Sequence, residues 1–377
     1  MFNLTSWMNL KTSSDGAPNV IKESDSSDST WNQVVAANAS PNPSTPNAFS
    51  YGYSHSGLPS FSPLAITTPP LSTIMFDPAT HSISAVSVTD LSNILISTTS
   101  HKASVPNQLC LLSLDSVLRA SDVNTNQTPV ATEIKHMFPT ESGIICVGDS
   151  LSSLSLCSED SLQLTNLGWS SKDENTMFSC ADCNDSSLFA WGQKNVFNIQ
   201  NLHDTTKTSK ITLADDLTSI SLSPSSLAES TVTTSSSLQI LDFRQQQTVS
   251  TFETKHAPNC HAALSEFKYV VCGNSPEVEF LDVRRAASLG TFVCPSIHSV
   301  TSIVCAKESQ TICLSGANGF AIMDVSCTPF VSCVTHHSHA ALCSVALAEG
   351  TDGLFNDHFL VSSGCLVECF SGSSSFK

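Results

Sequence analysis

Basic residues are scarce in this sequence. Its 377 residues include 16 Lys and Arg against 33 Asp and Glu, which gives a formal net charge of −17. Proteins that bind nucleic acid neutralise its phosphates with a basic patch, and no such patch is visible here. We therefore expect no direct contact with nucleic acid. An acidic surface is compatible with a basic protein partner, such as one with Arg-rich tails, because opposite charges steer association.

Long apolar runs are also missing. No stretch approaches the length that spans a membrane, and residues 1–19 lack the basic start and apolar core of a secretory signal. We therefore expect an intracellular protein with reduced thiols and no membrane contact. Most of the 15 cysteines lie inside apolar segments, where a free thiol behaves as a small hydrophobic side chain; examples are Cys110, Cys146, Cys157, Cys272, Cys313, Cys365 and Cys369.

Motifs for catalysis are absent as well. The sequence has no Gly-x-Ser-x-Gly motif, no phosphate-binding glycine loop and no dinucleotide fingerprint. Paired carboxylates occur at Asp215-Asp216 and Glu159-Asp160, in loop-like segments without a partnered histidine or a nucleophile. We therefore expect a protein that is not an enzyme, with no catalytic residue and no cofactor.

What the sequence does contain is a repeat of about forty residues. Residues 238–244 and 278–284 both end in Leu-Asp-x-Arg, and an apolar run and a Gly-Asn-Ser-Pro turn lie between them. With Leu241 and Leu281 as reference positions, equivalent positions recur about every 40 to 44 residues along the chain. They are Leu114, Cys157, Ile199, Met323 and Val367.

Seven evenly spaced repeats of short strands predict an all-β fold, a seven-bladed β-propeller over residues 71–371. Alternation of side chains over residues 217–222 has the two-residue period of a half-buried strand. A β-sandwich would also show short strands, but it has no reason to repeat one signature seven times. The aspartates that follow the reference positions should close outer strands and form turns; they are Asp115, Asp242, Asp282 and Asp324.

The ends of the chain differ from the repeats. Residues 1–70 are rich in Ser, Pro and Asn and should form a disordered tail, because they cannot bury enough apolar surface to fold alone. Residues 372–377 should form a short C-terminal tail. We expect the strand near Ile74 to Phe76 to close the ring by completing the last blade, since closure removes exposed sheet edges.

Cysteine and histidine supply the remaining candidates for a metal site. Cys180 and Cys183 form a single Cys-x-x-Cys, without the second pair that a zinc site needs or the strand-to-helix context of a redox motif, so a structural role is expected. His336, His337, His339 and Cys343 should lie in a loop between the outer strand of one blade and the inner strand of the next. His256, His261 and His298 fall at similar places in neighbouring repeats. This recurrence favours a turn or capping role over metal binding.

The repeat endings resemble the Trp-Asp endings of WD-repeat proteins, with Leu or Met in place of Trp and without the Gly-His pair. Within that superfamily, the layout resembles the methylosome protein 50 family, the WD-repeat partners of the type II arginine methyltransferase. The stretches that carry the resemblance are residues 108–112 with 143–150, 278–283 with 298–303, and 330–370. The aromatic-rich first-blade loop of that family appears here as residues 104–107, Ser-Val-Pro-Asn, so we assign no partner-binding residues.

This resemblance implies a non-catalytic scaffold in the cytoplasm and nucleus. It would bind a protein arginine methyltransferase and help to present Arg-rich substrates such as Sm proteins and histones. One alternative is the WD-repeat nucleoporin of the Y-shaped pore scaffold, which residues 242–246 and the Cys-rich last strand resemble, although that family has larger insertions between blades. Another is an enzyme on a propeller scaffold. An enzyme would need carboxylates or histidines that converge in the central channel, and we expect none there.

Overall fold

The computed structural model describes residues 64–371, apart from residues 67–69, 90–92, 119–125, 141–142, 149–153, 159–160, 168–178, 185–187, 224–227, 295–296, 298, 307–309, 327–332, 339–342 and 349–357. Most of the expected N-terminal tail, residues 1–63, and the expected C-terminal tail, residues 372–377, lie outside the described residues. None of the helices that the described residues form has the length and apolar character needed to span a membrane. The twelve cysteines whose side chains the structure describes are all free thiols.

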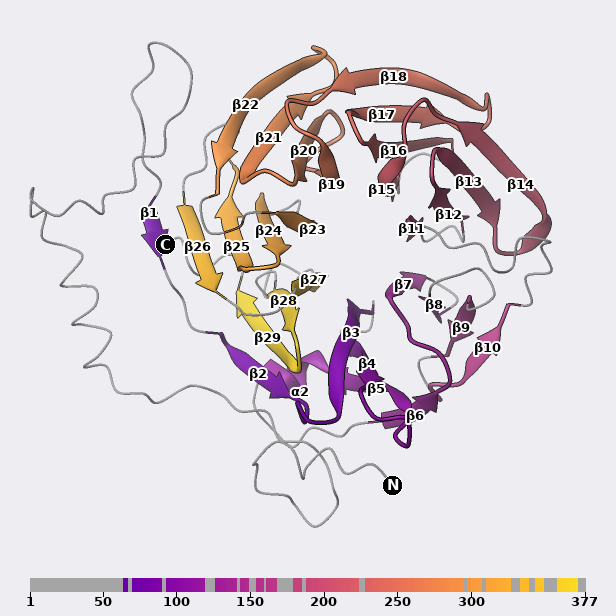
Figure 1. Ribbon diagram of the computed structural model, residues 1–377, viewed down its shortest axis with the longest axis vertical. Coiled ribbons are helices and arrows are strands. Elements are labelled where there is room, and N and C mark those ends of the chain that lie inside the picture. Colours follow the sequence, from indigo (N-terminus) through magenta and orange to yellow (C-terminus); the bar gives the residue numbers. More distant parts are fainter. Residues whose placement is uncertain are drawn as a thin grey trace, which may run out of the picture.

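Seven antiparallel sheets stand around one axis as the blades of a β-propeller, which confirms the predicted fold (Figure 1). Blade 1 contains β3 (His81–Val88), β4 (Asn93–Ser100), β5 (Asn107–Ser113) and β6 (Asn126–Val130). Blade 2 contains β7 (His136–Thr140), β8 (Gly143–Val147), β9 (Ser155–Cys157) and β10 (Leu164–Asn166). Blade 3 contains β11 (Cys180–Cys183), β12 (Leu188–Gln193), β13 (Val196–Asn201) and β14 (Asp204–Thr212).

The remaining blades follow the same order from the axis outward. Blade 4 contains β15 (Leu217–Leu222), β16 (Glu229–Thr234), β17 (Ser237–Asp242) and β18 (Gln247–Glu253). Blade 5 contains β19 (Pro258–Ala263), β20 (Lys268–Gly273), β21 (Glu277–Asp282) and β22 (Ala287–Val293). Blade 6 contains β23 (Val300–Ala306), β24 (Thr311–Gly316), β25 (Gly319–Asp324) and β26 (Cys333–Ser338). Blade 7 contains β27 (Cys343–Ala348), β28 (His358–Ser363), β29 (Leu366–Ser371) and β2 (Ser72–Met75).

Strand β2 closes the ring, as the sequence predicted (Figure 1). It pairs antiparallel with β29, and Ile74 lies opposite Val367. The amide of Leu71 donates to the carbonyl of Cys369 at 2.7 Å, and the amide of Phe76 donates to that of Cys365 at 2.8 Å. The side chains of Ile74 and Phe76 are buried against blades 7 and 1. The first and last described blades are therefore joined by both backbone pairing and apolar packing.

Blade 6 carries a fifth strand that the sequence did not predict. Strand β1 (Leu64–Ile66) pairs in parallel with β26, and Leu64 lies opposite Cys333. These three residues belong to the segment that we expected to be tail. A Leu-Ala-Ile triplet can extend along the open edge of an outer strand, which offers unpaired backbone groups. One described strand thus lies before residue 71, where the sequence predicted the propeller to start.

The sequence repeat marks the third strand of the blades. The reference positions Ile199, Leu241 and Leu281 lie in β13, β17 and β21, and the next two lie in β25 and β29. Leu114 is the exception, because it follows β5 and begins the helix α2 (Leu114–Leu118). The prediction that the repeat closes outer strands was wrong for this reason: the outermost strand is the fourth, and its exposed residues, as in β18, carry no common apolar signature.

The apolar core lies in the seams between neighbouring blades. Seven clusters of buried residues each join two adjacent blades. Between blades 6 and 7, for example, the ring centroids of Phe320 and Phe370 are 4.8 Å apart. Because each seam buries side chains from two sheets, the blades stabilise one another around the ring.

Candidate functional site

A polar cavity of about 1370 Å³ lies where the inner strands approach the axis of the propeller. Inner strands β11, β15, β19 and β23 supply much of the lining, and the cavity continues into the seam between blades 4 and 5. Small polar side chains dominate the axial wall; they include Ser179, Thr218, Ser219, Ser221, Ser230, Asn259, Thr301 and Ser302. Small side chains fit here because the inner strands converge toward the axis.

A β-bulge re-aims the side chains of several inner strands. In β15 the register shifts between Leu217 and Ser219, and Leu217, Ile220 and Leu222 are all buried. The strict two-residue alternation predicted for residues 217–222 is therefore broken at its start. Similar shifts occur at the start of β19 and β23 and in β3. Bulges of this kind bend a strand locally and change which face a side chain takes.

His261 lies on β19 and lines the cavity. Its side chain is buried, and neither ring nitrogen has a hydrogen-bond partner. Burial lowers the pKa of His261 to about 4, so the ring is neutral at physiological pH, and polar contact with the Thr231 backbone opposes this shift. The described lining therefore brings no carboxylate into hydrogen-bonding contact with this imidazole.

Asp182 lies on β11 and ties blade 3 to blade 4. Its Oδ1 accepts from the amide of Cys183 at 2.9 Å, and its Oδ2 accepts from the amide of Leu222 at 2.7 Å. Burial raises the pKa of Asp182 to about 7, and the two amide donors oppose that rise. The two hydrogen bonds give this carboxyl group a clear structural role at the wall of the cavity.

Aromatic and charged groups line the cavity in the seam between blades 4 and 5. Burial raises the pKa of the Tyr269 hydroxyl, and the negative charges of Glu229 and Glu266 raise it further. The guanidinium carbon of Arg284 lies 4.6 Å from the ring centroid of Phe267. The same guanidinium is 3.3 Å from Asp282, which is outside the lining.

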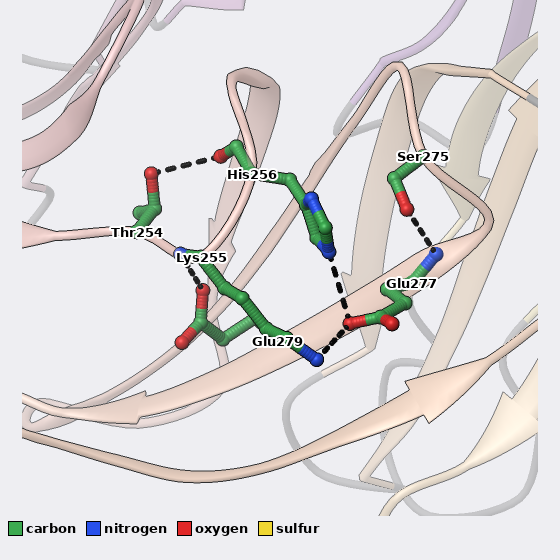
Figure 2. A network of polar contacts seen from close by, with 6 residues as sticks. All are labelled: Thr254, Lys255, His256, Ser275, Glu277 and Glu279. Atoms are coloured by element: carbon green, nitrogen blue, oxygen red, sulfur yellow. Dashed lines mark hydrogen bonds and ion pairs between the residues drawn. The ribbon is translucent and has the colours of Figure 1, made fainter.

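The two faces of the ring have different polar features. We call one end of the ring the lower face. It carries the turns at residues 264–267 and 283–286, and the part of the cavity between blades 4 and 5 lies at this end. The upper face is the opposite end, which carries the connections between blades, such as residues 254–257. Figure 2 shows the polar network on that connection.

In this upper network, Lys255 and His256 both point toward the carboxylate of Glu277 (Figure 2). Lys255 Nζ lies 2.6 Å and His256 Nε2 lies 3.1 Å from Glu277 Oε2. The amide of Lys255 donates to Glu279 at 2.9 Å. The hydrogen bond from Lys255 is the main reason that the pKa of Glu277 is lowered. These half-exposed pairs hold the connection into blade 5, and ion pairs of this kind add little stability.

The structure places the candidate histidines differently from the sequence prediction. His256 lies in the connection between β18 and β19, as predicted. His261 lies inside β19, and His336 and His337 lie inside the outer strand β26, so their predicted loop positions were wrong. His298 and His339 lie outside the described residues, and Cys343 begins β27. Strands β19 and β26 are longer than the sequence prediction assumed, so they include histidines that were assigned to loops.

The candidate cysteines lie together on one inner strand. Cys180 and Cys183 are the first and last residues of β11, and the thiol of Cys183 lies 3.7 Å from the carbonyl of Asn184. Burial raises the pKa of the Cys180 thiol to about 11. Among the described residues, no group of three or more His, Cys, Asp or Glu side chains could hold a metal ion.

The candidate carboxylates have local roles where they are described. Asp215 accepts from the Ser236 hydroxyl at 2.6 Å, next to Asp216 in the connection into blade 4. Glu159 and Asp160 lie outside the described residues.

The predicted turn role of the repeat aspartates is confirmed for three of them. Asp242, Asp282 and Asp324 each accept from the amide two residues further on, at 2.8, 3.0 and 2.9 Å. Asp115 lies in helix α2 and closes no strand, so its prediction was wrong.

Titratable side chains do reach the wall of this cavity. The cavity lining includes His136, Asp182, Glu229, His261 and Glu266. The repeat was the one sequence signal that could have placed these residues at the cavity, because they lie on or beside strands whose positions follow from it. A scan against models of protein families found no match, and a search of curated proteins found no similar sequence.

Proposed function

We propose that this protein is a non-catalytic scaffold that binds protein partners on the faces and rim of its propeller. The closed ring supports this best: β2 completes blade 7, and the ring then presents short turns and connections on two faces. Binding residues are commonly held on loops that a stable scaffold positions. The fold is consistent with a WD-repeat protein, and many proteins with such propellers act through binding alone.

The partner we propose is a type II protein arginine methyltransferase, in a methylosome of the cytoplasm and nucleus. In that complex the propeller would help to present Arg-rich substrates such as Sm proteins and histones, and would contact neither nucleic acid nor membrane. Three features support this: the family resemblance of the repeats, the net charge of −17, and the carboxylates of Glu229 and Glu266 at the lower face. Acidic surfaces attract Arg-rich chains and speed their association.

The test is affinity capture from the cells that produce the protein, followed by mass spectrometry. The tagged full chain should recover an arginine methyltransferase. A chain with Ile74→Asp, which places a charge in the packing of the closing strand, controls for capture that does not need the closed ring. Recovery of pore-scaffold subunits would favour the nucleoporin alternative instead. Transfer or hydrolysis catalysed by the purified chain would contradict a non-catalytic role.

A further inference from the structure

The outermost strand of a blade has one edge whose backbone groups have no neighbour in its own hairpin, and such an edge can pair with another chain. In six blades the outer strand carries a feature that discourages this pairing. Strand β10 has three residues and β2 has four. Pro129 lies in β6, and Lys207 and Lys210 lie in β14. Strands β18 and β22 contain bulges, because their register with β17 and β21 shifts. Short length, proline, lysine and bulges all protect an edge.

The outer strand of blade 6 has none of these features. Strand β26 pairs with β25 over all six of its residues, Cys333 to Ser338, without a shift in register. Its sequence, Cys-Val-Thr-His-His-Ser, contains no Pro, Lys, Arg, Asp or Glu. A regular edge without fixed charge is a template for the addition of a further strand.

This edge already holds one added strand (Figure 1). Strand β1 pairs in parallel with the first half of β26, from Leu64 opposite Cys333 to Ile66 opposite Thr335. A hairpin turn cannot bring in a parallel neighbour, so this pairing comes from the edge itself and not from local chain connection. Among the described strands, none pairs with the outer side of residues 336–338. The template is therefore longer than the strand that occupies it.

Strand β1 is a short occupant that a longer strand can displace. Its three residues form few backbone hydrogen bonds, and ordering them costs conformational entropy of similar size. In the sequence, Pro63 and Pro69 flank residues 64–68, and proline has no amide to donate to a sheet. A strand without these prolines would form more hydrogen bonds with the same edge.

We propose that the outer edge of blade 6 is a docking site for an extended strand of a protein partner, which adds in parallel to β26, and that β1 is an internal cap on this site. The partner's strand is uncharged and free of proline over about six residues, because β26 offers six residues in register and no fixed charge. Backbone hydrogen bonds supply the affinity. This inference rests on the proposed function, in which the propeller binds protein partners.

The test measures fluorescence anisotropy with the full chain and the blocked, labelled peptide Thr-Leu-Ala-Ile-Thr-Thr, which repeats residues 64–68 after a Thr in place of Pro63. The cap is weakened by the double variant Ala65→Pro, Ile66→Pro. Successive amides point to opposite sides of a strand, so one of these prolines removes a donor that faces β26. The double variant should bind the peptide about tenfold more tightly than the parent, the factor expected when the cap occupies the edge about nine-tenths of the time.

Controls separate the cap from other effects. The variant Ala65→Val, Ile66→Val keeps both amides and should bind the peptide as the parent does. The peptide Thr-Leu-Pro-Pro-Thr-Thr should not bind. Equal binding of the two peptides, or no binding of the first peptide to the proline variant at millimolar concentration, would overturn the proposal. Thermal melts check folding, and Ala65→Gly, Ile66→Gly, which weakens a strand without proline, replaces a proline variant that melts early.

Hydrogen exchange then locates the peptide. In the proline variant, the peptide should slow exchange of the β26 amides and leave those of β18, the outer strand of blade 4, unchanged. Equal protection of both strands would reject a site on blade 6. Light scattering tests the other occupant: a dimer formed by the proline variant and not by the parent would assign the edge to a second copy of this chain and overturn the proposal of a partner.

The two proposals can fail separately. Capture of the methyltransferase is measured without the peptide, and peptide binding is measured without the methyltransferase. If the peptide does not bind while the methyltransferase is still recovered, the scaffold function stands and the strand site is wrong. If the peptide binds and no methyltransferase is recovered, the strand site stands and the identity of the partner is wrong.

Discussion

Two side chains that line the cavity, the buried His261 and the half-buried Asp182, should give the folding free energy opposite dependences on pH. Burial lowers the pKa of His261 from 6.5 to about 4, so the folded state binds fewer protons than the unfolded state between those values. The stability from a neutral His261 is therefore lost as the pH falls through that window. Burial raises the pKa of Asp182 from 3.8 to about 7, so the folded state binds more protons in that range. The stability from a protonated Asp182 is lost as the pH rises.

The size of each effect follows from the pKa change. At about 1.4 kcal/mol per pKa unit, His261 accounts for about 3 kcal/mol and Asp182 for up to about 4 kcal/mol. Access of water to the cavity side of Asp182 reduces the second figure. Because the two slopes have opposite signs, they largely cancel over the range in which both groups titrate. Replacement of one group should therefore reveal the slope of the other.

The assay is urea unfolding at several pH values, followed by the fluorescence of the tryptophans, which include the buried Trp191. Relative to the parent, His261→Leu should gain stability as the pH falls, and Asp182→Asn should gain stability as it rises. The exposed Val249 on β18 provides the control Val249→Thr, in which neither side chain titrates. Other titratable groups remain in all variants, so subtraction removes their contribution. Differences that stay constant with pH would refute the assignment of buried, perturbed groups to this cavity.

Three further predictions concern the ring itself. Phe76→Ala and Phe292→Ala each empty the site of a ring that is 2% exposed, so both should lower the free energy of unfolding by about 3–5 kcal/mol. Only Phe76→Ala should speed hydrogen exchange of the β29 amides, because it weakens the closing strand; equal exchange in both variants would contradict that role. Gly273→Ala places a Cβ against the carbonyl oxygen of Ala257, and should destabilise by about 1–3 kcal/mol in urea titrations. Asp282→Ala should lower the melting temperature, because it removes a turn that the side chain forms; an unchanged melt would show that the turn holds without it.

The fold could be predicted because its repeat follows from packing. A third strand is buried on both faces, so its apolar residues and its turn aspartate recur, as at Leu241-Asp242 and Leu281-Asp282. The closing strand could be predicted because Ile74 and Phe76 had no other blade to join. Strand β1 and the bulges could not be predicted. Strand β1 forms because the outer edge of blade 6 is open to pairing, and each bulge is a register shift between two strands. Neither leaves a signal in the local sequence.

The candidate site was harder to predict for a different reason. Inner strands of several blades build the cavity, and each contributes one or two small side chains that look like ordinary strand or turn residues. In the sequence, His261 looked like a loop residue, as its neighbour His256 is. The two histidines are only five positions apart, but His256 lies in a connection and His261 is buried in a strand. Only the three-dimensional register shows that these two side chains have different surroundings.

Asp182 and His261 differ in the hydrogen bonds that they make within the ring. Asp182 accepts two backbone hydrogen bonds, one of them from the next blade, so its polarity is explained by the fold. The same holds for Thr218, whose hydroxyl donates to Thr233 at 3.0 Å. His261 makes no comparable bond to a neighbouring blade, and its burial lowers its pKa to about 4. The buried imidazole therefore contributes to the ring through packing more than through polar contacts between blades.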